Sequence, residues 1–256
     1  MTELLDVSHL TKTFAGISAL DDIGLSVGRE ERVGLIGPNG AGKTTLFNCL
    51  LGITRPDRGN IIFDGEDVGS LPVHVRARRG IGRTFQRIEL FSGASVREHL
   101  LIAERARRGT GGLLKDIIGR GRASIDELER CDEVLALLGL DPLADAPIES
   151  LSLGKGRLVE VGRALMTDPQ LLLLDEPSSG LDRSETAALA ATLRQVQAER
   201  RFAILLVEHD VELVADFTER SYVVDFGTII ARGPTRSVMR DPVVRRAYLG
   251  DLEATQ

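Results

Sequence analysis

The chain is short of cysteine, of long apolar runs and of positive charge, and each shortage excludes a class of protein. Its 256 residues include two cysteines, Cys49 and Cys131, both inside apolar helical patterns. We therefore expect neither a disulfide framework nor a zinc site, and a reducing cytosol fits. No apolar run approaches the roughly 20 residues that cross a bilayer, and the first residues lack the features of a signal peptide. The formal net charge of −6 argues against general nucleic-acid binding.

What remains is the composition of an ordinary globular protein, 43% hydrophobic and 27% charged, with enough apolar material for a substantial core. Short apolar strands alternate with helical patterns, which predicts a mainly parallel sheet with right-handed crossovers. The predicted strands are two within Leu5–Val27 around a turn at Ala15-Gly16, then Arg32–Ile36, Asn60–Phe63, Leu171–Leu174, Ala203–Val207, Tyr222–Phe226 and Thr228–Ala231. The predicted helices are one ending near Leu51, Pro72–Arg79, one through Leu158 and Leu165, Ser184–Arg200 and Asp210–Phe217.

Between about Phe91 and Ser150 the pattern becomes helical. Ser95 with Glu98 forms a capping-box signature. Apolar residues at helical spacing follow, ended by Gly139: Ile125, Leu128, Cys131, Leu135 and Leu138. The Arg- and Gly-rich stretch Arg105–Arg122 lacks periodicity and is predicted to be a mobile loop. The block as a whole is predicted to be a helical insertion in an α/β core.

The most informative motif is the stretch Gly37–Thr44, Gly-Pro-Asn-Gly-Ala-Gly-Lys-Thr. It lies between an apolar strand and an apolar helix, as a phosphate-binding loop requires. Glycines let successive backbone N–H groups turn towards a triphosphate, and the helix adds its positive end. Lys43 is placed to reach the β/γ-phosphates and the Thr44 hydroxyl to hold Mg²⁺. The alternative is a glycine turn without a ligand.

A second motif joins an apolar strand, Leu171–Leu174, to the carboxylates Asp175 and Glu176. Asp175 is predicted to hold Mg²⁺, directly or through water, and Glu176 to polarise the attacking water as a general base. The alternative is an acidic pair near the start of a helix. Gln86 is a candidate for Mg²⁺ or the attacking water, with a surface amide as the alternative. His209, after the strand Ala203–Val207, is a candidate for the γ-phosphate, with a capping or solvated histidine as the alternative.

Six motifs in order give a family resemblance: the chain is similar to the nucleotide-binding subunits of ATP-binding-cassette (ABC) transporters. The motifs are Walker A at Gly37–Thr44, the Q-loop at Gln86, the signature at Leu151–Lys155, Walker B at Leu171–Glu176, the D-loop at Ser179–Asp182 and the switch at His209. The resemblance covers essentially the whole chain. It implies a P-loop NTPase fold with a RecA-like α/β core at 1–90 and 151–256, a mixed, mainly parallel sheet with N-terminal antiparallel strands, and an inserted helical subdomain at 91–150.

The resemblance also assigns roles to single residues. Phe14 would stack on adenine, although by itself it reads as a strand core aromatic. The nucleotide would further contact Asn39, Gly40, Ala41, Gly42, Lys43, Thr44, Thr45, Ser152, Gly154 and Asp182. Mg²⁺ would be held by Thr44, Gln86 and Asp175. The catalytic set would be Glu176, His209, Gln86 and Lys43.

In such transporters two cassettes close head-to-tail on two ATP molecules, so that Ser152 and Gly154 of one subunit would meet the γ-phosphate bound by the other. Ser152 at the start of a helix forms a second anion cradle, although by itself the sequence reads as a helix cap. The signature departs from the common Leu-Ser-Gly-Gly-Gln at Leu153 and Lys155.

Within the family, three stretches resemble the ATPases of branched-chain amino-acid importers: Gly37–Leu51, Arg83–Phe91 and Glu208–Val214. The longer helical insertion resembles the larger ATPase of the usual pair. The implied partners are a second cassette, two integral membrane permease subunits and, indirectly, a substrate-binding protein, at the cytoplasmic face of the membrane. Phe91, Leu90, Arg83 and Arg87 are candidates for permease contact. Relatives serving urea, other amides or lipopolysaccharide export remain alternatives. A soluble ABC ATPase of DNA repair or translation is disfavoured because the chain lacks heptads and basic arms.

Overall fold

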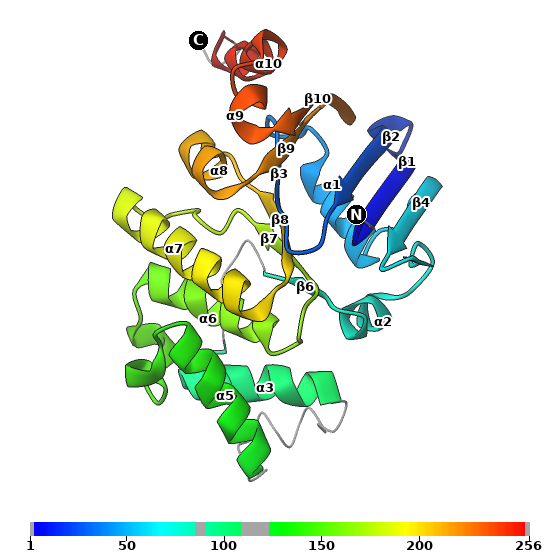
Figure 1. Cartoon of the computed structure of the whole chain (residues 1–256). Coiled ribbons are helices and arrows are strands. Elements are labelled where there is room, and N and C mark those ends of the chain that lie inside the picture. The colour runs from blue at the N-terminus through cyan, green and yellow to red at the C-terminus, as the bar shows by residue number, and fades with distance from the viewer. Residues whose placement is uncertain (1–2, 85–90, 109–122, 254–256) are drawn as a thin grey trace. The chain divides into compact units, whose positions relative to one another are not determined.

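The computed structural model describes residues 3–84, 91–108 and 123–253, and the side chains of these up to residue 247 (Figure 1). The predicted site residue Gln86, together with Arg87 and Leu90, lies outside the described residues. The chain divides into two compact units. Unit 1 comprises Met1–Ile81, Gln170–Glu176 and Arg201–Gln256, and unit 2 comprises Gly82–Pro169 and Pro177–Arg200.

Unit 1 contains the predicted strands in the predicted order. Its elements are β1 (Leu5–Phe14), β2 (Ile17–Val27), β3 (Arg32–Ile36), α1 (Lys43–Leu51), β4 (Arg58–Phe63), β5 (Glu66–Asp67), α2 (Val73–Arg78), β7 (Leu171–Asp175), β8 (Ala203–Val207), α8 (Val211–Phe217), β9 (Arg220–Asp225), β10 (Thr228–Pro234), α9 (Thr235–Val238) and α10 (Pro242–Glu253). β6 (Ile81–Arg83) starts at the last residue of the first segment.

Two sheets organise this unit. The larger has the order β10-β9-β3-β8-β7-β6, in which β9, β3, β8 and β7 run parallel and β10 is antiparallel to β9. The smaller has the order β2-β1-β4-β5 and is antiparallel. The predicted mixed sheet with N-terminal antiparallel strands is therefore confirmed.

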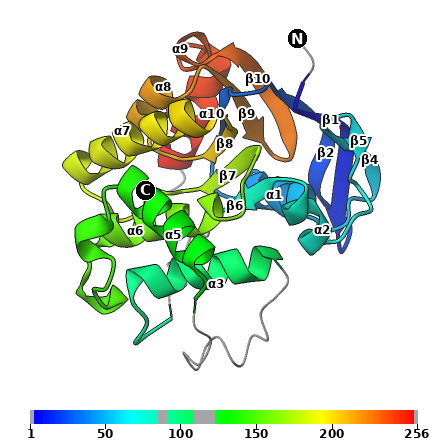
Figure 2. The ribbon, with the colours of Figure 1, turned by 60° about the horizontal axis from the view of Figure 1, so that its bottom comes forward.

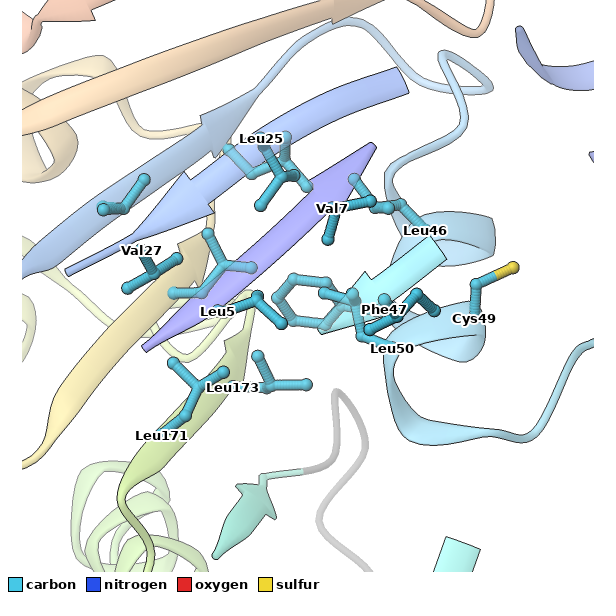
Figure 3. Packing of buried hydrophobic residues seen from close by; sticks show 14 of the residues in the cluster. Leu5, Val7, Leu25, Val27, Leu46, Phe47, Cys49, Leu50, Leu171 and Leu173 are labelled. Carbon is cyan, nitrogen blue, oxygen red and sulfur yellow. The ribbon is translucent and has the colours of Figure 1, made fainter. Parts of the chain in front are cut away.

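The core of unit 1 joins α1 to both sheets. Leu46, Phe47 and Leu50 of α1 are fully buried or nearly so, and they pack among residues of β1, β2 and β7 (Figure 3). β7 and β8 are buried at every position, as expected of central parallel strands covered on both faces. α1 ends at Gly52, whose φ of 80° gives the predicted left-handed stop. From Leu46 to Leu51, α1 is thus anchored by apolar contacts.

Unit 2 is helical. Its elements are α3 (Val96–Arg108), α5 (Ile125–Leu137), two 3₁₀ turns at Asp141–Leu143 and Ile148–Ser150, α6 (Leu153–Leu165) and α7 (Arg183–Arg200). α3, α5 and α6 pack together, and α7 lies along α6 (Figures 1 and 2). The predicted capping box forms, because Ser95 and Glu98 exchange backbone-to-side-chain hydrogen bonds. A second capping box, which was not predicted, joins Ser124 and Glu127 at α5. Of the predicted α5 face, Ile125 is exposed, because it lies at the first helical residue.

The prediction of a loop starting at Arg105 is wrong for its first four residues, because α3 continues to Arg108; residues 109–122 lie outside the described part of the chain. A buried carboxylate explains the extension. Glu104 is 0% exposed and accepts hydrogen bonds from Arg107 at 2.9 Å and Arg108 at 2.6 Å. Nε of Arg130 on α5 lies 3.1 Å from it. These charge pairs stabilise a helix end that has no apolar periodicity.

His99 is buried in unit 2 and holds the loop before α3. Its Nε2 accepts a hydrogen bond from the Phe91 N–H at 2.8 Å, and its Nδ1 lies 2.8 Å from the Ser95 carbonyl oxygen. These partners require a neutral ring protonated at Nδ1. Burial lowers the pKa of His99, which favours that neutral form. Across the described residues, no helix combines the length and apolar character needed to traverse a membrane.

Candidate nucleotide-binding site

Three strand ends of unit 1 meet at one edge of the larger sheet. β8 lies between β3 and β7, and its Val207 is aligned with Leu35 on one side and with Asp175 on the other. Neighbouring strands lie about 4.8 Å apart, so the segments that follow them leave the sheet within about 10 Å of each other. The sheet thereby brings together three predicted elements: the glycine loop, the acidic pair and the His209 segment.

The glycine loop packs closely against neighbouring backbone. A Cβ on Gly37 would lie 2.0 Å from the Val224 carbonyl oxygen, and one on Gly42 would lie 2.5 Å from the Ala19 carbonyl oxygen. Gly42 also has a φ of 109°, a left-handed conformation that side chains disfavour. Side chains at these two positions would therefore collide with the backbones of β9 and β2, so that packing alone already requires glycine there.

Lys43 is the first residue of α1, and its ammonium turns back into the loop. Nζ donates to the carbonyl oxygens of Gly37 at 2.6 Å and Pro38 at 2.8 Å, and the residue is only 7% exposed. A fixed positive charge thus lies beside the start of a helix, where backbone N–H groups are unpaired. Thr44 is exposed and Thr45 half-buried. This arrangement of lysine, helix end and glycine loop suits a polyphosphate.

The acidic pair divides into a buried and a half-buried carboxylate. Asp175 ends β7 and is 4% exposed. Glu176 continues the strand ladder by donating its N–H to the Val207 carbonyl oxygen at 2.9 Å, then turns the chain with a φ of 47°. A left-handed conformation costs a non-glycine residue about 1–2 kcal/mol, and such strain often accompanies functional sites.

The pair Glu208-His209 follows β8. The His209 side chain is 61% exposed, with Nδ1 3.7 Å from Oε2 of Glu208, and the same oxygen accepts the His209 N–H at 3.1 Å. Glu208 itself is 0% exposed. Glu208 is not among the predicted site residues, although it directly follows a buried apolar strand, as Glu176 does on the neighbouring strand. Asp210 begins α8 as its cap.

Phe14 lies at the end of β1 and is 48% exposed, so its alternative interpretation as a core aromatic is wrong. The Lys12 ammonium lies 5.3 Å from the centre of its ring and is held by Asp57 at 2.8 Å. An aromatic face exposed in unit 1 is available to a planar base.

The remaining predicted nucleotide contacts belong to unit 2. Ser152 is the N-cap of α6, where its Oγ accepts the Lys155 N–H at 3.4 Å. Arg157, one turn further, donates to the Ser179 carbonyl oxygen in the D-loop at 3.1 Å. Asp182 accepts the Glu185 N–H at 2.8 Å and donates its own N–H to Glu185 at 3.2 Å, a capping arrangement that starts α7. The helix that follows the signature is therefore joined to the D-loop through the Arg157 side chain.

The donor set of unit 1 is compatible with Mg²⁺. Thr44 supplies a hydroxyl and Asp175 a buried carboxylate, which are the hard oxygen ligands this ion prefers. Among the described residues, no group of three or more His, Cys, Asp and Glu side chains is placed to hold a metal.

The fold and the site together define a P-loop nucleotide-binding protein, and comparison with known proteins narrows the class. Residues 20–179 match the family model described as ABC transporter. The chain is 40% identical to the high-affinity branched-chain amino acid transport ATP-binding protein LivG of Escherichia coli K12, covering 97% of this chain and 98% of LivG. It is 36% identical to the lipopolysaccharide export system ATP-binding protein LptB of Haemophilus influenzae, in an alignment that covers 97% of this chain and 98% of LptB.

Among solved structures, the ADP conformation of the ATP-binding cassette MJ1267 superimposes with a TM-score of 0.88 at 30% identity, covering 98% of this chain and all of that one. This chain belongs to the ABC transporter family, and it is one of the ATP-binding subunits that hydrolyse ATP. The resemblance identified from the motif order is confirmed.

Proposed function

We propose that this chain energises the import of branched-chain amino acids by hydrolysing ATP at the cytoplasmic face of the cell membrane. The observation that carries the proposal is similarity along almost the whole chain to LivG, whose name gives that solute. The solute would be bound by integral membrane permease subunits and an associated substrate-binding protein, and this chain would be their peripheral motor.

The proposed chemistry is attack of water on the γ-phosphate. Lys43 would neutralise charge on the β/γ-phosphates, and Glu176 would accept a proton from the attacking water. His209 and Gln86 would stabilise the developing charge and orient the water. Mg²⁺, held by Thr44 and Asp175 with Gln86, would supply electrostatic neutralisation of the phosphate oxygens. The adenine would stack on Phe14, and the triphosphate would follow Asn39 to Thr45.

Each complete site would need two cassettes. Ser152, Gly154 and Asp182 would serve the nucleotide held by the partner cassette, since the helix end at Ser152 offers a second cradle for an anion. Closing on ATP and reopening after hydrolysis would drive alternating access in the permease. The partner would be a second copy or, as the resemblance implies, a related smaller ATPase.

Export of lipopolysaccharide is the second candidate, favoured by the 36% identity with LptB. The identity of the membrane partners distinguishes amino-acid import from lipopolysaccharide export. The tagged Glu176→Gln variant should bind ATP without hydrolysing it. It should therefore retain its partners when it is pulled down with ATP from detergent-solubilised membranes of the source cells. We expect ATP-dependent recovery of a second cassette and a polytopic amino-acid permease, identified by mass spectrometry, with Lys43→Ala as the non-binding control.

Recovery of lipopolysaccharide-export subunits would replace the import proposal with the export one. Recovery of ribosomes or nucleic acid instead of membrane subunits would contradict both. Wild-type turnover by Glu176→Gln would contradict the general-base role of Glu176.

A further inference from the structure

A cavity of about 420 Å³ lies entirely within unit 2, between the end of α5, the start of α6 and one face of α7. These three helices lie side by side (Figures 1 and 2). Ser152 and Gly154 of the signature contribute to its wall. The volume is in the range of small-molecule sites, about 300–1,000 Å³.

One part of the wall is aliphatic. Leu138, Leu158 and Leu189, from three different elements, line the cavity and are 3%, 8% and 4% exposed. Polar groups without hydrogen-bond partners are costly against such a surface. This part of the cavity therefore selects a branched or linear hydrocarbon group.

The other part carries two opposite charges, those of Lys155 and Glu185. Both side chains line the same cavity, and in the described part of the chain they form no ion pair with each other. Oε2 of Glu185 accepts the Asp182 N–H, whereas Oε1 lies 3.3 Å from the position that a Cβ on Gly154 would occupy. A side chain at position 154 would therefore crowd this carboxylate oxygen, and the glycine avoids that. A cation and an anion thus line one cavity without forming an ion pair.

We propose that this cavity binds a free aliphatic α-amino acid. The ligand carboxylate would pair with Lys155, its ammonium with Oε1 of Glu185, and its side chain would lie on the three leucines. Opposite charges beside an apolar wall match the charge pattern of that ligand class. The proposal also gives a role to Lys155, which stands where the common signature has glutamine.

Occupancy would affect ATP hydrolysis, because Ser152 lines the same cavity. A ligand there fixes the first turn of α6 against α7, and the signature would lose the freedom to adjust to a partner's nucleotide. The choice of leucine as the ligand, and the meaning of this effect as feedback by the transported solute, rest on the proposed function.

Calorimetric titration of the full chain with L-leucine tests the binding. We expect saturable binding that is at least tenfold weaker for 4-methylpentanoate, which lacks the ammonium, for isoamylamine, which lacks the carboxylate, and for L-glutamate. Ala188 lines the cavity and is exposed on α7, so Ala188→Trp should fill it and weaken leucine binding at least tenfold. Ala187→Trp is the matched control, because Ala187 is exposed on the same helix outside the lining, and it should bind within twofold of wild type.

Lys155→Gln offers a second, independent variant and should also weaken leucine binding at least tenfold. Steady-state ATP hydrolysis should fall severalfold with saturating leucine in wild type and in Ala187→Trp, and stay unchanged in Ala188→Trp. Absence of leucine binding by wild type, or equal binding by Ala188→Trp, would overturn the proposal. If leucine binds as expected while the recovered membrane partners belong to lipopolysaccharide export, the cavity assignment stands and only the import assignment fails.

Discussion

Unit 1 and unit 2 differ in the interactions that stabilise each of them internally. The core of unit 1 is a continuous cluster of leucine, valine, isoleucine and phenylalanine side chains on two sheets and α1 (Figure 3). Both units contain contacts between arginine and carboxylate, but the pairs of unit 1, such as Arg32–Glu219 and Arg220–Glu31, keep both side chains partly exposed. In unit 2 a fully buried carboxylate, Glu104, meets three arginines, and further pairs join Arg130 to Asp168 and Arg97 to Asp132 and Asp145. Burial of apolar area is insensitive to pH, whereas ion pairs depend on the charge state of both partners.

The same difference separates the two sets of predicted site residues. In unit 1 the glycine loop is packed against β2 and β9 so closely that side chains would collide, and Lys43 is held by two carbonyl groups. In unit 2 Ser152 and Asp182 are held by helix caps at the surface, each worth only about 1 kcal/mol. The predicted phosphate site is therefore rigid and the predicted signature site more easily adjusted, as the proposed motor function requires.

The largest expected effect is on the rigid site. Lys43→Ala should reduce ATP hydrolysis about 100- to 1000-fold, the usual loss when one charge-stabilising donor is removed. Single-turnover hydrolysis measures this, and circular dichroism checks that the fold survives. Arg29→Ala, which removes a cation paired with Asp64 outside the loop, serves as control and should retain most of the activity. Comparable losses in both variants would contradict the special role of Lys43.

The second-largest expected effect is a loss of stability confined to unit 2, where the buried carboxylate of Glu104 contacts three arginines. Glu104→Gln removes the negative charge shared by Arg107, Arg108 and Arg130, and should lower the free energy of unfolding of unit 2 by about 2–3 kcal/mol. Glu129→Gln on the exposed side of α5 is the matched control, with an expected change below about 0.5 kcal/mol. Hydrogen exchange should show the loss in α3 and α5 and leave β3 and β8 unchanged. A uniform loss across both units would mean that they unfold as one.

The sequence predicted the strands of unit 1 well because their signals are local. Four consecutive leucines before Asp175 favour a buried strand because the run is too short for a helix, and the glycine loop marks the start of α1. It also predicted which chemical groups end these strands, since parallel strands end at one edge. The left-handed backbone at Glu176 could not be predicted, because no glycine signals it.

Predictions failed where distant partners decide the structure. Arg105–Arg108 has no apolar periodicity, and only the contacts of Glu104 with Arg130 on another helix explain why the helix continues. For Phe14, only the alternative interpretation as a strand core aromatic failed, because the residue lies at the exposed end of a hairpin. Glu208 was overlooked because a carboxylate at full burial is not expected from sequence alone.

The two cysteines provide a test of acid sensitivity, since Cys49 lies in α1 of unit 1 and Cys131 in α5 of unit 2. Burial raises the pKa of Cys49 to about 11 and that of Cys131 to about 12, so both thiols should be unreactive in the native protein. Burial by itself raises the pKa of Glu104, but hydrogen bonds from Arg107 and Arg108 outweigh it and hold the pKa below 4.5. A lowered pKa adds stability above the unfolded value, and this stability is lost as the pH falls through the folded value.

The pKa of Glu127 is lowered in the same way. Burial by itself raises this pKa, but the hydrogen bond from the Ser124 backbone and the positive charge of Arg105 outweigh the effect of burial. Unit 1 has a similar partly buried carboxyl in Glu31, paired with Arg220, but its apolar core does not titrate. Below about pH 4.5, pulse labelling with dithiodipyridine should therefore modify Cys131 before Cys49. Each single-cysteine variant, with the other cysteine replaced by alanine, gives the rate separately. Earlier or simultaneous labelling of Cys49 would contradict the assignment of acid sensitivity to unit 2.

The smallest expected effect concerns the cap of α5. Ser124 accepts the Glu127 N–H at 3.2 Å and Glu127 accepts the Ser124 N–H at 2.8 Å, so Ser124→Ala removes half of a capping box and should destabilise unit 2 by about 1 kcal/mol. Urea unfolding followed through the reactivity of Cys131 measures the change, and Ser124→Asp, which also accepts the N–H bond, should recover most of it. The reactivity of Cys49 should shift less, because α1 is anchored by apolar contacts in the other unit. An equal shift at both cysteines would show that the helix caps of unit 2 contribute to one cooperative transition with the apolar core of unit 1.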